Sequence, residues 1–285
     1  VKVGLILLFI AAGLLTADSQ AISLLPQAGD GQLLRSSGFA VSLVWVSYAY
    51  TGWNSTVYIA GEMLHPQRDI PRSILLSTIF VMVLYVLLNF VFLYTTPRTA
   101  MMGEIEIGYI AGQYIFGAAG AKIFALGISI LLLSTVSSYV YIGPRIMQTM
   151  GQDYSYISFL SKTNDQGIPV NAFLLQLLIC LAFIFSSSFE QVLLYAGIVL
   201  IFTTTITTAA VFVLRYKEPD LPRPYNTWGY PWTPLIFIIV NLWILYYTFW
   251  ERTMESIIGI GIIAVSLGLW FLGKQYEHKR QGSIS

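Results

Sequence analysis

The chain has 285 residues, of which 56% are hydrophobic and only 10% are charged. This composition excludes a soluble globular domain and indicates a polytopic, all-α membrane protein. The formal net charge is +1 and no Lys- or Arg-rich stripe is present, so a nucleic-acid partner is not expected. The one cysteine, Cys180, rules out a disulfide framework or a cysteine-based metal site within this sequence.

Apolar segments of about 20 residues predict eight membrane spans. The first begins at Val1 and contains one charge, Lys2; because it has no initial Met and no basic region ahead of it, we interpret it as a truncated N-terminus. One transmembrane domain, 1–273, would be followed by a cytoplasmic tail at 274–285. The expected spans are 1–17, 38–63, 72–94, 122–150, 169–185, 190–214, 235–250 and 256–272.

The second span contains a small, polar and aromatic run at mid-depth, which predicts a break between two half-helices. The first, 39–50, would be only about 18 Å long, and the second would cover 57–64. Unwound backbone at this depth is tolerated only where protein buries it or where it lines a water-filled cavity, so the break is a candidate substrate site. The alternative is an ordinary span that carries a Gly and some polar residues. The run consists of Tyr48, Ala49, Tyr50, Thr51, Gly52, Trp53 and Asn54.

The connections and later spans carry further local signals. We expect 64–71 to form a short loop, with Pro71 in the first turn of the next helix, and 95–121 to form an external hairpin whose apolar part, 107–116, is too short to span. Gly143 and Pro144 should kink or end the long segment that contains them. Ser188 and Gln191 fit a capping box. The hydroxyls of Thr203, Thr204, Thr205, Thr207 and Thr208 can bond backward to helix carbonyls.

Basic residues set the orientation, because short loops rich in Lys and Arg remain cytoplasmic. When the loops are assigned alternately to the two sides of the membrane, ten Lys and Arg residues fall on one side and four on the other. Lys2, within the first span, is the fifteenth. The C-terminus is therefore expected in the cytoplasm, and the location is expected to be the cell membrane.

No convergent catalytic or metal-binding set occurs within the spans, so neither an enzyme nor a cofactor or metal site is expected. Glu62, near the end of the broken span, is either a solvated or ion-paired helix terminus, or a gate or proton acceptor. From composition alone, Lys2 would extend its ammonium to the interface.

Four stretches together resemble the second half of a permease of the amino acid/polyamine/organocation superfamily, with likeness to L-type amino acid transporters and their bacterial relatives. The run 48–54, followed by Glu62, Pro66, Arg68, Ile70 and Pro71, resembles the sixth helix and the loop after it. The others are 142–153, which resembles the end of the eighth helix; 215–225, which resembles the loop after the tenth; and 1–5, which resembles the start of the fifth. The resemblance covers helices five to twelve.

The resemblance implies an inverted five-plus-five repeat with a broken sixth helix, two extra C-terminal helices and alternating access. In this family, carbonyls at the break bind the substrate's amino group, and that role falls here on Tyr48, Ala49 and Thr51. Tyr48 would also close over the substrate, and Asn54 would line the site. A partial negative charge at the C-terminus of a half-helix suits such a cation.

The resemblance also matches Lys2 to a fifth-helix lysine that occupies an ion site, with Thr135 opposite it on the eighth helix. Low dielectric disfavours a charged ammonium, so proton coupling is one hypothesis, and a permanently charged substitute for sodium in an exchanger is another. The expected function is secondary transport of amino acids, by proton-coupled symport or exchange. A polyamine transporter, or a non-transporting amino acid sensor or accessory subunit, is the alternative. The expected partners are the substrate, the bilayer, protons, and the missing N-terminal helices or a partner chain.

Overall fold

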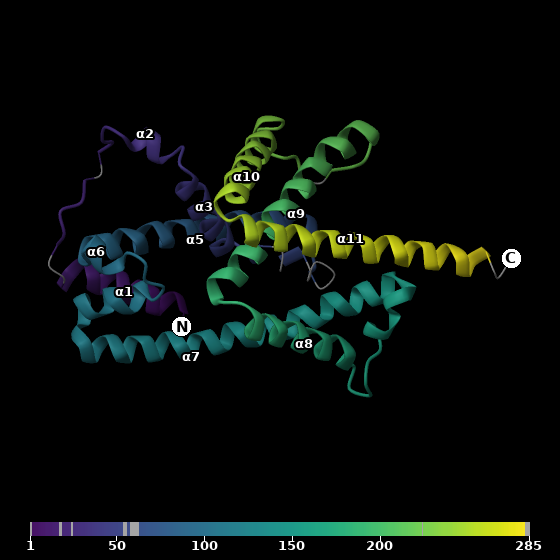
Figure 1. Cartoon of the computed structure of the whole chain (residues 1–285), viewed down its shortest axis with the longest axis horizontal. Coiled ribbons are helices and arrows are strands. Elements are labelled where there is room, and N and C mark those ends of the chain that lie inside the picture. The colour runs from purple at the N-terminus through teal and green to yellow at the C-terminus, as the bar shows by residue number, and fades with distance from the viewer. Residues whose placement is uncertain are drawn as a thin grey trace. The chain divides into compact units, whose positions relative to one another are not determined.

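The structure, a computed structural model, describes residues 2–16, 19–23, 25–53, 56–57, 63–223 and 225–282. These residues form helices and turns without a strand, so the all-α prediction is confirmed. Figure 1 shows the elements in chain order: α1 (Lys2–Thr16), α2 (Asp30–Leu33), α3 (Ser37–Ala49), α5 (Pro66–Thr95), α6 (Arg98–Met101), α7 (Ile107–Asp153), the 3-10 helix η2 (Ser155–Leu160), α8 (Val170–Ser186), α9 (Phe189–Lys217), α10 (Trp232–Glu251) and α11 (Thr253–Gly282).

Among the described residues, five helices are long and apolar enough to cross a membrane. They are α5, α7, α9, α10 and the part of α11 from Thr253 to Tyr276, whereas α1, α3 and α8 are shorter apolar helices. A helix of 20 residues is about 30 Å long, which matches the hydrocarbon core of a bilayer. The layout of eight spans in one domain remains a prediction.

Two expectations about the connections were wrong. Helix α5 begins at Pro66, so 66–71 is helical and is not a loop. Pro66 stands at the first helical position, where its missing N–H costs least, and Pro71 then removes only one bond inside the helix. The expected end of a helix at Gly143 and Pro144 was also wrong, because α7 continues to Asp153; the alternative, a kink there, stays a prediction. The apolar run 107–116 forms the start of α7, which is interrupted at Gly117, where φ is 71°.

The first compact unit comprises Val1–Gln27 and Arg72–Ile142. Its core is formed by α1, α5 and α7, with Phe9 at the centre at 1% exposure. The ring centroid of Phe9 lies 5.7, 5.9 and 4.7 Å from those of Phe92, Phe116 and Phe124. The four rings come from α1, α5 and α7, so this aromatic cluster holds the three helices together. Large aromatic side chains dominate the energetics of a core.

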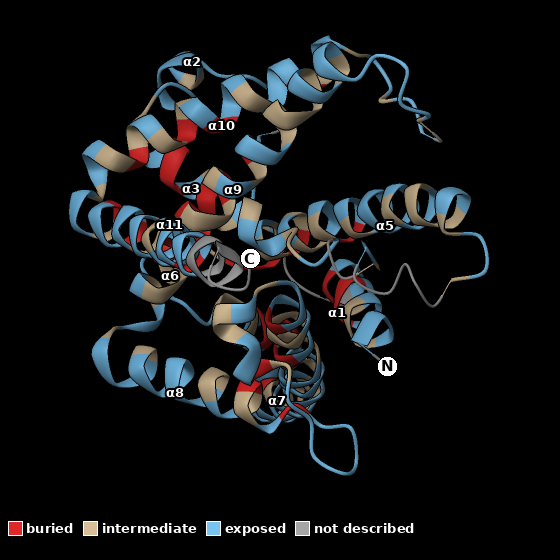
Figure 2. Cartoon of the chain, turned by 90° about the vertical axis from the view of Figure 1, so that its right-hand side faces the viewer, coloured by how far each residue is buried: buried red, intermediate tan, exposed pale blue. Residues whose placement is uncertain are grey.

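The second compact unit comprises Ala28–Pro71 and Gly143–Ser285. Here α3, α9 and α10 pack together around Val41, Val44, Leu194, Ile201 and Ile244. Figure 2 shows red, buried stretches on these three helices, whereas much of the outer surface of the helices is exposed and blue. Exposed apolar faces are expected in a membrane protein, because lipid is as apolar as the side chains that it contacts.

Candidate functional site

Helix α3 begins at a defined cap. The side-chain oxygen of Ser36 accepts a hydrogen bond from the backbone N–H of Phe39 at 3.2 Å, as is typical of a serine N-cap. Val41 and Val44 hold the following turns against α9 and α10. The start and the middle of α3 are therefore both anchored.

The helix ends at Ala49, where the sequence predicted the break. Tyr50 leaves the helical region with φ −92° and ψ 7°, and the N–H of Thr51 donates to the carbonyl of Tyr48 at 3.0 Å. Gly52 then has φ +113°, a conformation that residues with a Cβ rarely adopt. The turn is therefore built around a glycine that sits inside an apolar segment.

Six of the seven predicted substrate residues, 48–53, lie in this turn or in the helix end before it. Tyr48 and Ala49 belong to the last turn of α3, and residues 50–53 form the turn. The side chains of Tyr48 and Trp53 are 40% and 44% exposed, so both are accessible. Asn54, Glu62 and most of the predicted second half-helix lie outside the described residues. A helix C-terminus carries partial negative charge, so this end of α3 is electrostatically suited to a cation.

The predicted coupling residues lie in the first unit, where Lys2 and Thr135 meet. The Lys2 ammonium donates a hydrogen bond to the Thr135 hydroxyl at 2.7 Å, and that hydroxyl donates to the carbonyl of Leu131 at 3.2 Å. The structure thus brings together two residues that the resemblance placed opposite one another. The Lys2 side chain is exposed, and both residues line a largely apolar cavity of about 380 Å³.

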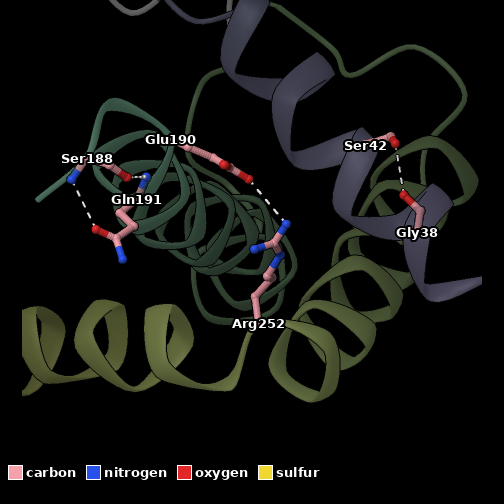
Figure 3. A network of polar contacts seen from close by, with 6 residues as sticks. All are labelled: Gly38, Ser42, Ser188, Glu190, Gln191 and Arg252. Carbon is pink, nitrogen blue, oxygen red and sulfur yellow. Dashed lines mark hydrogen bonds and ion pairs between the residues drawn. The ribbon is translucent and has the colours of Figure 1, made fainter. Parts of the chain in front are cut away.

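An ion pair at one end of the second unit was missed by sequence reasoning. Arg252, the residue that ends α10, lies 3.2 Å from Glu190 in the first turn of α9 (Figure 3). The predicted capping box stands beside it and is confirmed, because Ser188 and Gln191 each bond the other's backbone N–H. An acidic side chain in a first turn and a basic one at a helix end each complement the helix dipole.

The opposite ends of α9 and α10 are also held by arginines. The Arg223 guanidinium donates to the carbonyls of Leu214 and Glu218 at 3.3 and 2.6 Å, and to those of two further residues, Pro219 and Leu221. The guanidinium of Arg215 lies 3.7 Å from the ring centroid of Tyr230, in cation–π geometry. A signal for Arg223 was available in principle, since a basic residue near a helix C-terminus can bind the last carbonyls.

The threonine-rich face of α9 behaves as predicted. Each of its five threonine hydroxyls donates to a carbonyl in the preceding turn, as in the bond from Thr205 to Ile201 at 2.6 Å. These hydroxyls are satisfied within their own helix, which favours a packing role over a ligand-binding role.

The sequence matches the family described as amino acid permease over residues 1–278. It is 24% identical over 241 residues to large neutral amino acids transporter small subunit 2 of Mus musculus, covering 84% of this chain and 45% of the relative. The chain is 26% identical over 235 residues to solute carrier family 7 member 12 of Mus musculus, covering 82% of this chain and 50% of the relative. It is 23% identical over 236 residues to the serine/threonine exchanger SteT of Bacillus subtilis, covering 81% of this chain and 53% of the relative.

The chain spans about half the length of the curated relatives that it matches. Those relatives are named as transporters, a solute carrier and an exchanger, and none is named as an enzyme. The family match and the five long apolar helices make this a multi-pass membrane protein. The chain belongs to the amino acid permease family.

Proposed function

We propose that the protein to which this chain belongs is a secondary transporter of amino acids, and that the turn after α3 is part of its substrate site. The observation that carries the proposal is the end of α3 at Ala49, within an apolar segment and before a glycine at φ +113°. Carbonyls at such a helix end suit the substrate's ammonium group. The transporter names of the relatives support an amino acid as the substrate.

In this proposal the transporter works by alternating access: it changes between a state in which the site is open to one side of the membrane and a state in which it is open to the other. Helix α3 packs on α9 and α10 up to Val44 and then ends five residues later. In transporters with broken helices, alternating access is largely a rocking of one helix bundle against another around the substrate site. The membrane is proposed to be the cell membrane, with the C-terminus in the cytoplasm as the basic loops indicate.

Coupling is proposed to involve Lys2 and Thr135. The ammonium donates a direct hydrogen bond to the hydroxyl, so a change in the charge of the lysine alters its interaction with Thr135 on α7. Proton coupling predicts that an imposed pH gradient drives uptake and that Lys2→Ala abolishes this response. Uptake that ignores the gradient in both proteins would refute it and would favour exchange.

The test of the substrate site is counterflow of labelled amino acids in proteoliposomes that contain the complete natural protein. Gly52→Ala forces a Cβ onto a residue at φ +113°, a strain of about 1–2 kcal/mol, which lowers the population of this turn conformation roughly 5- to 30-fold. The apparent affinity falls by the same factor where substrate binds only this conformation. The matched control is Gly38→Ala, because a Cβ there meets only Ser36 Oγ at 4.0 Å.

Each outcome of this experiment distinguishes the alternatives. A weaker apparent affinity in Gly52→Ala, with Gly38→Ala unchanged, supports the site. Saturable binding without counterflow would identify a sensor, and counterflow of spermidine but not of amino acids would identify a polyamine transporter. Equal kinetics in the two glycine variants would refute the placement of the site.

A further inference from the structure

The cavity beside Lys2 is mostly apolar, and its polar lining side chains are those of Lys2, Tyr85 and Thr135. It has a volume of about 380 Å³ and lies between α1, α5 and α7 in the first unit. On the part of α7 after Gly117, its lining extends from Phe124 to Thr135, twelve residues or about 16 Å of helix. Phe9, Phe92 and Phe124 form its aromatic floor. The cavity therefore has a polar head region and a long apolar body.

The polar end has a positive charge and no carboxylate of its own. The helical segments that line the cavity, 2–16, 72–95 and 107–142, contain no Asp or Glu. In the described part of the chain, the structure gives the Lys2 ammonium one acceptor, the Thr135 hydroxyl. An ammonium has three donors, so a ligand with an anionic group could bind it beside Thr135.

We propose that this cavity binds a single-chain amphiphilic carboxylate, such as a fatty acid, with its head group on Lys2 and its chain on the aromatic floor. An apolar cavity of about 150 Å³ accommodates benzene, so about 380 Å³ has room for roughly ten to fifteen carbon atoms. A transported amino acid does not fit this description, because its own ammonium would be repelled by Lys2 and would find an apolar lining.

The proposal does not rest on the proposed transport function, and the test measures binding alone. The complete natural protein is placed in nanodiscs of zwitterionic lipid, and binding of radiolabelled dodecanoate is measured. The competitors are methyl dodecanoate, which lacks the charge, and dodecylamine, which reverses it. Saturable dodecanoate binding is expected, with both competitors at least about tenfold weaker, because only the acid pairs with the ammonium.

The decisive variant is Lys2→Met, which keeps the apolar stem and removes the charge. We expect it to bind dodecanoate and its methyl ester with equal affinity. The matched control is Lys122→Met, since Lys122 is an exposed lysine of α7 that does not line the cavity; this variant should retain the preference for the acid.

Two results would overturn the proposal. Equal binding of acid, ester and amine to the natural protein would show that the charge of Lys2 plays no part. The absence of saturable binding would show that lipid or another segment of the protein fills the cavity. Both results are measured on the unmodified protein, so misfolding of a variant does not affect the test. A protein that shows no counterflow can still bind dodecanoate, so the test is independent of the transport proposal.

Discussion

The contact between Gly197 of α9 and Val44 of α3 provides a direct test of the packing that holds α3. A Cβ built on Gly197 of α9 lies 2.5 Å from Cγ1 of Val44 on α3, and the Val44 side chain is only 2% exposed. Gly197→Ala therefore adds a methyl group where no space exists, and α3 or the Val44 side chain must move.

The expected loss of stability follows from two opposing effects. Overpacking a well-packed core costs about 1–3 kcal/mol, whereas replacing glycine by alanine inside a helix gains roughly 0.5–1 kcal/mol. The net destabilisation should be about 0–2.5 kcal/mol. Val44→Ala alone should destabilise by about 2 kcal/mol through the cavity that it leaves.

The assay is a double-mutant cycle by thermal unfolding in detergent, together with counterflow. The double variant should be more stable than the sum of the single changes predicts, by about 1 kcal/mol, because the new methyl group fills the space that Val44 vacates. Gly261→Ala is the control, since a Cβ on that glycine of α11 meets nothing within 4 Å. If Gly197→Ala behaves like the control and the cycle closes without coupling, the proposed contact between α3 and α9 is refuted.

Three further predictions concern the ends of α9 and α10. Ser188→Ala should lower stability by about 1 kcal/mol through loss of the cap, whereas Ser188→Asn should retain most of it in the same unfolding assay. Glu190→Gln should cost only about 0.2–1 kcal/mol, since the Glu190 and Arg252 side chains are 46% and 41% exposed; the loss should shrink at high salt, and a loss that is independent of salt would contradict an ion pair. Arg223→Lys should destabilise the loop by about 1–2 kcal/mol, because one ammonium cannot reach the four carbonyls that the guanidinium binds; protection of the loop from proteolysis equal to that of the natural protein would contradict this role.

Local signals allowed several features to be predicted from the sequence. The break after Ala49 followed from a glycine and polar residues within an apolar segment, and the structure ends α3 there. The capping box at Ser188 and the backward bonds of the α9 threonines involve residues within four positions of one another. Such features depend on the local chain, so a single sequence suffices to predict them.

Errors occurred where a local rule competed with helix continuity. Pro71 was expected to mark the beginning of a helix, yet Pro66 supplies that signal five residues earlier and α5 runs through Pro71. Pro144 was expected to kink or end α7; it does not end the helix, which continues for nine more residues. A proline removes one bond and introduces one clash, and a long apolar helix can retain its remaining bonds in lipid, where unwinding is far more costly.

The sequence by itself determined the membrane class, the helical fold, the position of the break and, through a family resemblance, the pairing of Lys2 with Thr135. Composition and short-range patterns contain this information because lipid requires every backbone group to be bonded within its own helix. Only the tertiary structure decided that Val44 packs against Gly197 and that Arg252 pairs with Glu190, 62 positions away in the chain. It also decided that an apolar cavity without a carboxylate adjoins Lys2. These contacts join residues that are distant in the chain, and they depend on how helix faces pack together, which no local pattern specifies.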